Sequence, residues 1–169
     1  MSADASTAEV FWSRGITPAA WTTYGLPDPP AVSHSNGMPP NGRLQVPSGA
    51  QAGTDGSGGS NGSDPRLRRC GWSWCIILDK KVVASRSGPV SGKQTVPRAE
   101  ITAIADFLEH THTQGATTIH VDCKPALDKV LQLQKGQWKP DCHTVNGDLW
   151  LKVHDQISRR RGALTFKQN

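Results

Sequence analysis

The sequence predicts an α/β fold in which helices flank a mixed β-sheet. Residues 71–78 alternate large apolar side chains with small ones, and a second apolar run follows at 82–84, which together indicate an antiparallel hairpin. Helical apolar stripes then alternate with short strand-like runs through the rest of the 169 residues. Strand–helix–strand units imply parallel neighbours, so we expect both kinds of strand pairing in one sheet.

A proline- and glycine-rich arm is expected at residues 1–50, ahead of a folded domain at 51–169. Eight of the twelve prolines and ten of the seventeen glycines lie within residues 1–65. Proline fixes φ and lacks a backbone donor, so the stretch at 13–50 is interpreted as a linker or extended arm. Its aromatic residues could dock on a neighbouring domain or cover a patch of this one, and the sequence leaves both possibilities open: Phe11, Trp12 and Trp21.

The elements of the domain follow in order along the chain. Residues 49–53 form a poor strand by composition, whereas 71–78 alternate clearly, with Cys75 expected in the core. The remaining predicted elements are a loop at 88–94, a helix from about Pro97 that Thr95 can cap and Gly115 ends, a strand at 117–122, helices at about 124–134 and 146–160, and a strand from Leu164.

Composition limits the function classes. The formal net charge of +5 is compatible with a polyanionic partner. No apolar run is long enough to span a membrane and the first residues lack a secretory signal, so we expect an intracellular protein with no membrane partner. We also expect a monomer. Because the sequence shows no secretory signal, the four cysteines are expected to be free thiols and not a disulfide framework, and their spacing does not match the usual zinc sites.

Three acids are candidates for a metal centre. Asp55 precedes a glycine–serine turn, Glu100 lies in the first helical run, and Asp122 ends a strand. Sites gather at the carboxyl ends of parallel strands, and Mg²⁺ prefers clustered oxygen ligands. Glu100 shares a stripe with Ile104 and Phe107, so it should face the sheet, where a carboxylate is unfavourable unless paired or metal-bound. Taken singly, each acid could instead serve a turn, a helix start or a cap.

Five segments of the chain form a pattern: Thr54-Asp55-Gly56-Ser57-Gly58, Gly71-Trp72, Arg98-Ala99-Glu100-Ile101-Thr102-Ala103-Ile104, Val121-Asp122-Cys123-Lys124 and Asn146-Gly147-Asp148-Leu149-Trp150. In their order and spacing they resemble the ribonuclease H domain, most closely those attached to reverse transcriptases of retrotransposons. The resemblance covers roughly residues 53–169. The resemblance implies a ribonuclease H-like mixed sheet and cleavage of the RNA strand of RNA–DNA hybrids. It also implies two bound Mg²⁺ or Mn²⁺ ions and a reverse transcriptase domain in the parent protein.

The resemblance assigns roles to individual residues. Asp55, Glu100 and Asp122 match the first three metal-binding acids of the family. The residues expected to contact nucleic acid are Gly56 and Ser57, as backbone donors to a phosphate, and the basic side chains Arg98, Lys124, Lys135 and Lys139. The arginine run at 159–161 adds basic surface.

The chain also departs from the family pattern. The family has a fourth metal-binding aspartate after the strand that begins here at Leu164, and this sequence reads as truncated before it. Asp148 and Asp155 precede that strand and do not match the position. The alternative prediction is therefore a catalytically inactive, nucleic-acid-binding remnant. A calcium-binding loop at Asp55 is excluded, because its twelfth position is Arg66, where a bidentate glutamate is required.

Overall fold

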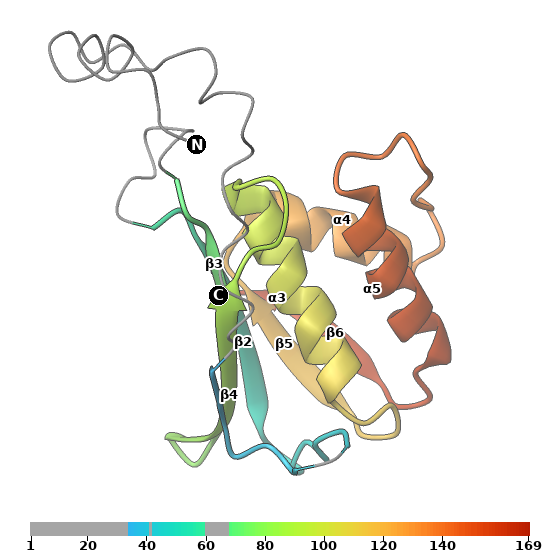
Figure 1. The fold of residues 1–169 in the computed structure, drawn as a ribbon. Helices are drawn as coiled ribbons and strands as arrows, with labels where there is room; N and C mark the ends of the chain where they lie inside the picture. Colours follow the sequence, from blue (N-terminus) through green and yellow to red (C-terminus); the bar gives the residue numbers. More distant parts are fainter. Residues whose placement is uncertain (1–33, 41, 60–67) are drawn as a thin grey trace, which may run out of the picture.

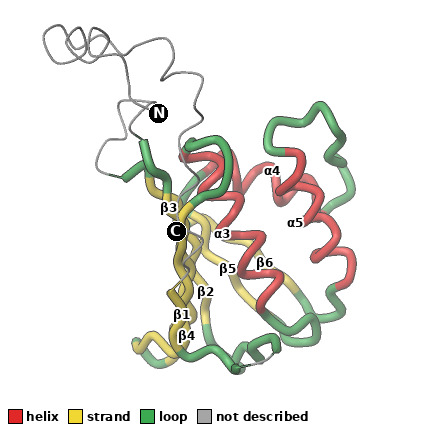
Figure 2. The backbone as a smooth tube through the Cα atoms, viewed as in Figure 1, coloured by secondary structure: helices red, strands yellow, loops and turns green. Residues whose placement is uncertain are grey.

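One six-stranded sheet organises the computed structural model, which describes residues 34–40, 42–59 and 68–169 (Figures 1 and 2). Its strand order is β1-β4-β3-β2-β5-β6. The strands are β1 (His34–Asn36), β2 (Gln51–Ser57), β3 (Gly71–Leu78), β4 (Lys81–Pro89), β5 (Thr117–Val121) and β6 (Leu164–Gln168). The helices are α3 (Val96–His110), α4 (Lys124–Gln134) and α5 (Gly147–Arg159).

The sheet has an antiparallel half and a parallel half that meet at β2. β3 pairs antiparallel with β2 and β4, and β1 extends that half at the edge. β5 pairs parallel with both β2 and β6. The predicted fold class, a mixed sheet with flanking helices, is therefore confirmed.

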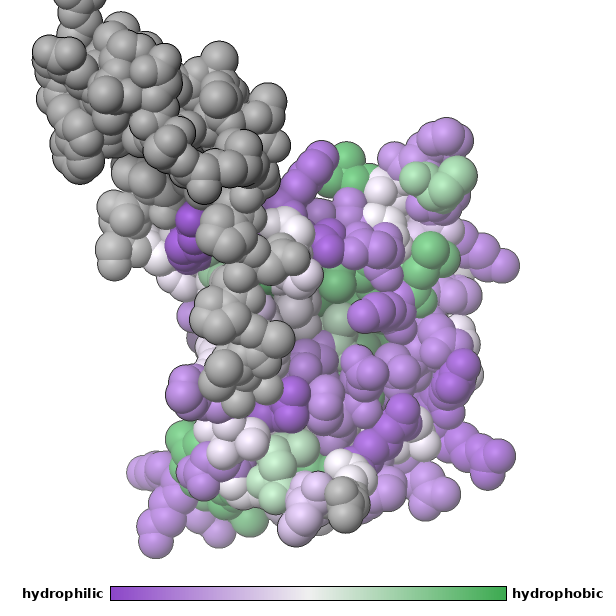
Figure 3. Space-filling model, in the orientation of Figure 1, coloured by the Kyte–Doolittle hydropathy of each residue, from purple (hydrophilic) through white to green (hydrophobic). Residues whose placement is uncertain are grey.

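The helices cover one face of the sheet, as Figure 1 shows. α3 packs on β2 and β3 and also against α5. Between these layers lies a core whose largest fully buried side chains include Ile76, Ile104, Phe107, Ile119 and Val153. The surface in Figure 3 is mostly hydrophilic, with hydrophobic side chains in separate small patches. No helix in the described part of the chain is long and apolar enough to cross a membrane.

The alternation predicted for β3 is confirmed, with one correction. Trp72, Trp74 and Ile76 are buried on the helix-covered face. Cys75, expected in the core, is only partly buried and points to the opposite face, where Ile77 is 41% exposed. Side chains of a strand alternate between its two faces, so Cys75, which lies between buried Trp74 and Ile76, points to the other face. All four cysteines are free thiols.

The described part of the predicted arm is packed on the domain. β1 pairs with β4, and Leu44 exchanges backbone hydrogen bonds with His110 and His112 at 2.8 and 2.9 Å. Val46 and Ala50 are buried in the core. Residues 34–40 and 42–50 are thus not a free linker, because these backbone groups find partners that composition does not reveal. The aromatic residues Phe11, Trp12 and Trp21 lie outside the described residues.

Three predicted details of the elements are corrected by the structure. The segment judged a poor strand begins β2, which is hydrogen-bonded on both sides by β3 and β5, so pairing overrides its low propensity. α3 ends at His110 instead of running to Gly115. The Thr95 hydroxyl makes no capping hydrogen bond within the described chain, although the Thr95 carbonyl accepts one from Ala99 at 3.1 Å.

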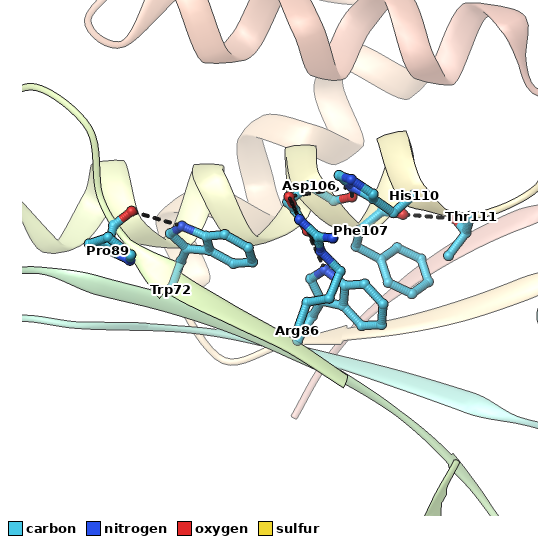
Figure 4. A network of polar contacts seen from close by, with 8 residues as sticks. Trp72, Arg86, Pro89, Asp106, Phe107, His110 and Thr111 are labelled. Carbon is cyan, nitrogen blue, oxygen red and sulfur yellow. Dashed lines mark hydrogen bonds and ion pairs between the residues drawn. The ribbon is translucent and has the colours of Figure 1, made fainter. Parts of the chain in front are cut away.

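A partly buried carboxylate ties α3 to the antiparallel strands (Figure 4). Asp106 accepts hydrogen bonds from Trp74 Nε1 at 2.7 Å and from Arg86 Nε at 3.0 Å. His110 Nδ1 lies 3.3 Å from its other oxygen. The Asp106 side chain is 13% exposed, so this charge-assisted network fixes the position of α3 over β3 and β4.

Replacing Asp106 with alanine should lower the free energy of unfolding by about 3 kcal/mol, because it leaves a buried indole N–H and a guanidinium without their acceptor. Urea unfolding of the full chain measures this change. Glu109→Ala, at an exposed position on the same helix, is the control and should stay within about 0.5 kcal/mol of the unsubstituted chain. Equal effects of the two substitutions would contradict the assigned role of Asp106.

Candidate metal centre

Three carboxylates from separate elements meet at one end of the sheet. Asp55 lies in β2, Glu100 in α3, and Asp122 directly after β5. One carboxylate oxygen of each lies within 4.8 Å of those of the other two. Parallel pairing of Thr54 with Val121 places the first and third acids next to each other. The structure therefore brings together all three acids that the sequence analysis selected.

Glu100 is the buried member of the cluster. Its side chain faces the sheet as predicted, its residue is 4% exposed, and its Oε2 atom is buried without a hydrogen-bond partner. Burial raises the Glu100 pKa to about 7, and the charges of Asp122 and Asp55 add to this rise, whereas a backbone hydrogen bond from Gly56 opposes it. A carboxylate in this position lacks a positive partner among the described residues, and a divalent cation would supply one.

Gly56 permits the close contact that delivers Glu100. A Cβ atom at this position would lie 2.5 Å from the Glu100 backbone nitrogen and 2.9 Å from the Ala99 carbonyl carbon. Any side chain on Gly56 would therefore push α3 away from β2. Gly56 was predicted to donate to a phosphate, but its backbone already donates to the Glu100 carboxylate.

Two hollows adjoin Asp55, which is itself exposed. One has a volume of about 470 Å³ and is lined by Asp55, Ser57 and Trp72 among others. The other, of about 590 Å³, is lined by Asp55, His120 and Asp122 among others. The predicted phosphate contact Ser57 is exposed here, and its hydroxyl accepts a hydrogen bond from Gly59 at 3.1 Å. An extended ligand could thus reach the acids from two sides.

Two of the predicted basic contacts are engaged within the protein. Arg98 donates to both carboxylate oxygens of Asp148, at 2.9 and 2.6 Å, and this bidentate contact raises the pKa of Arg98. The pair links the start of α3 to the start of α5. Lys124 pairs with Asp128 one turn along α4. Lys135 and Lys139 are exposed.

Two further residues near the acids were missed by the sequence analysis. His120 lines the larger hollow, and its Nε2 atom is buried without a partner. The available signal was its place two residues before Asp122 in the run predicted as a strand at 117–122, because residues two apart on a strand share a face. Asn169 lines the same hollow and donates its backbone N–H to the Val121 carbonyl at 3.3 Å. No sequence pattern marked Asn169.

Substituting Gly56 with alanine should destabilise the fold by about 3 kcal/mol, because backbone atoms of α3 occupy the space of the new methyl group. Gly53→Ala in the same strand is a matched control, since its Cβ would meet only the Cys75 Sγ at 3.9 Å. Chemical unfolding of both variants measures the difference. Similar stabilities would show that α3 does not need this close approach.

The metal-free protein should lose stability as pH rises from about 4.5 to about 7. A raised folded-state pKa means that the folded chain holds the Glu100 proton more tightly, so this stabilisation is present below pH 4.5 and is lost as pH passes 7. We expect a loss of about 2 kcal/mol, below the full value of the shift because Asp55 and Asp122 are exposed to solvent. Unfolding in the presence of a chelator measures it, and Glu100→Gln should flatten this part of the profile. An unchanged profile in that variant would contradict the assignment.

Comparisons by sequence return nothing. No protein-family model matches the chain. No curated protein matches it either.

Solved structures, in contrast, share the fold. The LC11-RNase H1 structure in complex with an RNA/DNA hybrid matches with 16% identity and a TM-score of 0.51, over 71% of this chain and 84% of that one. The solution structure of the PFV RNase H domain matches with 15% identity and a TM-score of 0.53, over 71% and 78%. The foamy viral protease-reverse transcriptase in complex with an RNA/DNA hybrid matches with 15% identity and a TM-score of 0.56, over 71% and 17%. The chain therefore adopts a ribonuclease H-like fold.

Proposed function

We propose that this chain is a metal-dependent endonuclease that cleaves the RNA strand of RNA–DNA hybrids, as part of a retroelement-derived protein. The observation that carries the proposal is the cluster of Asp55, Glu100 and Asp122, with a buried, unpartnered oxygen on Glu100. A buried carboxylate beside two others is unfavourable unless a cation balances it. This cluster of three carboxylates therefore fits a cation-binding site better than a set of side chains that only stabilises the fold.

The donor set fits Mg²⁺ or Mn²⁺. The cluster offers only carboxylate oxygens, with no cysteine or histidine within it among the described residues, and hard divalent cations prefer such ligands. Asp55, Glu100 and Asp122 would hold the metal. Two ions bound there would supply an activated water and stabilise the leaving oxygen of a phosphodiester.

The surrounding residues have supporting roles in this proposal. Gly56 keeps the Glu100 carboxylate in the cluster through its backbone hydrogen bond. Exposed Asp55 lies between the two hollows, where a phosphodiester can approach it from either side. Lys135 and Lys139 are exposed cations that can contact a nucleic-acid backbone. Arg98, held by Asp148, positions the starts of α3 and α5.

A hybrid duplex is the substrate that the comparisons favour. Two of the similar structures, LC11-RNase H1 and the foamy viral protease-reverse transcriptase, are complexes with RNA/DNA hybrids. A duplex of this kind is recognised by its shape and its 2′-hydroxyls more than by base sequence. We further propose that the parent protein carries a reverse transcriptase domain, consistent with the foamy viral neighbours.

Cleavage of a labelled RNA–DNA hybrid, with Mg²⁺ and then with Mn²⁺, tests the proposal. Asp55→Asn, Glu100→Gln and Asp122→Asn should each lower the rate by roughly a hundredfold or more, because each removes a metal ligand. Asp128→Asn is the control: it also removes one carboxylate, but from a surface pair with Lys124, and should leave the rate within about twofold.

A different outcome would support the alternative function. If the chain binds the hybrid in a salt-dependent manner but releases no RNA fragments with either metal, the nuclease proposal fails. The chain would then be an inactive, nucleic-acid-binding relative of these enzymes. Cleavage that survives all three substitutions would indicate a contaminating nuclease and would also remove the support for this site.

A further inference from the structure

A pair of arginines lies at the opposite end of the fold from the three acids. Arg160 directly follows α5. Arg43 directly precedes Leu44, whose backbone is hydrogen-bonded to His110, the last residue of α3, and to His112. Figure 1 shows the ends of α3 and α5 at this edge, far from the start of α3, and Figure 4 shows Thr111 at the end of α3. The five residues of β5 separate this edge from Asp122 by roughly 16 Å.

The Arg160 guanidinium has too few acceptors. Its Nη2 atom donates to Thr111 Oγ1 at 3.0 Å and to the His112 carbonyl at 2.9 Å. Its Nε and Nη1 atoms are buried and have no hydrogen-bond partner. A guanidinium carries five N–H groups, so about three of them lack an acceptor here. Buried donors without acceptors are rare in folded proteins and call for a partner.

The charge of this arginine pair is also unbalanced. Arg43 donates from Nη2 to the neutral Gln156 side chain at 3.2 Å. Burial and, to a lesser extent, the nearby charge of Arg43 lower the pKa of Arg160 to about 10. No carboxylate among the described residues forms an ion pair with either arginine, and neighbouring Asp155 is engaged by Arg159.

We propose that Arg43 and Arg160 bind a phosphate group. The planar forks of two guanidiniums match the several oxygens of a tetrahedral oxyanion. A carboxylate has two oxygens in one plane and would satisfy one fork only. Arg43 is held by one hydrogen bond to the neutral Gln156 side chain, so its guanidinium can reorient toward an anion beside Arg160.

This site stands independently of the proposed nuclease function, because none of its residues belongs to the acid cluster. The phosphate could be a free anion or part of a nucleic-acid backbone. Both sources present the same chemistry to the arginines, and two separate measurements distinguish them.

The first measurement is thermal unfolding of the full chain in inorganic phosphate and in chloride at matched ionic strength. Phosphate should raise the unfolding midpoint of the unsubstituted chain. Arg43→Gln should weaken phosphate binding by roughly tenfold, since it removes one of two forks. Arg159→Gln, which removes the same charge from the adjacent position, is the control and should stay within about twofold.

Three results would overturn the proposal: equal midpoints in phosphate and chloride, equal weakening by the two substitutions, or acetate acting as strongly as phosphate. Arg160→Lys provides a second variant, because it keeps the charge and loses the fork. It should also weaken phosphate binding, and unchanged binding would contradict the assigned geometry.

The second measurement is binding of an RNA–DNA hybrid at several salt concentrations in the presence of a chelator. The slope of the logarithm of the binding constant against the logarithm of salt concentration reports the number of phosphate contacts. If the nucleic-acid backbone occupies the site, Arg43→Gln should lower this number by about one, and Arg159→Gln should leave it unchanged. If hybrid binding is unchanged while inorganic phosphate binding is lost, the site takes a free phosphate compound. Both results support a phosphate site and identify its source.

Discussion

The contact between Gly56 and the backbone at Ala99 and Glu100 determines how this domain can work. It brings α3 so close to β2 that a single Cβ atom would not fit between them. The same contact inserts the Glu100 carboxylate beside Asp55, whose own neighbour Asp122 is fixed by parallel pairing of β2 with β5. Asp106 at the middle of α3 and Arg98 near its start hold the helix in this position through bonds to β3, β4 and α5.

Two groups of like charges lie at opposite ends of the sheet. Three acids gather at one end, where the nearby cations Arg98 and Lys124 are already paired with Asp148 and Asp128. At the other end, Arg43 and Arg160 lie together with neutral acceptors only. Like charges held together in a folded protein oppose folding unless an ion of opposite sign joins them. Both ends thus favour a ligand, a cation at one and an anion at the other.

Patterns within single elements could be predicted from the sequence, because they depend on local periodicity. The helix at Lys124–Gln134, the alternation from Trp72 to Ile76 and the inward direction of Glu100 all follow from the spacing of apolar residues. Features set by partners distant in sequence could not be predicted. β2 is a strand because two neighbours pair with it. Residues 34–40 and 42–50 pack through backbone hydrogen bonds, and Arg98 pairs with Asp148 fifty positions away.

Direct titration of the full chain with Mn²⁺ near pH 7 is the measurement that tests the account most directly. Calorimetry in buffers of different ionisation enthalpy reports both the affinity and the number of protons released. Because the Glu100 pKa is raised to about 7, a cation that binds its carboxylate should displace a proton, and Glu100→Gln should abolish the release and weaken binding. Binding of equal strength in that variant, or binding without proton release in the unsubstituted chain, would contradict a metal centre built around Glu100.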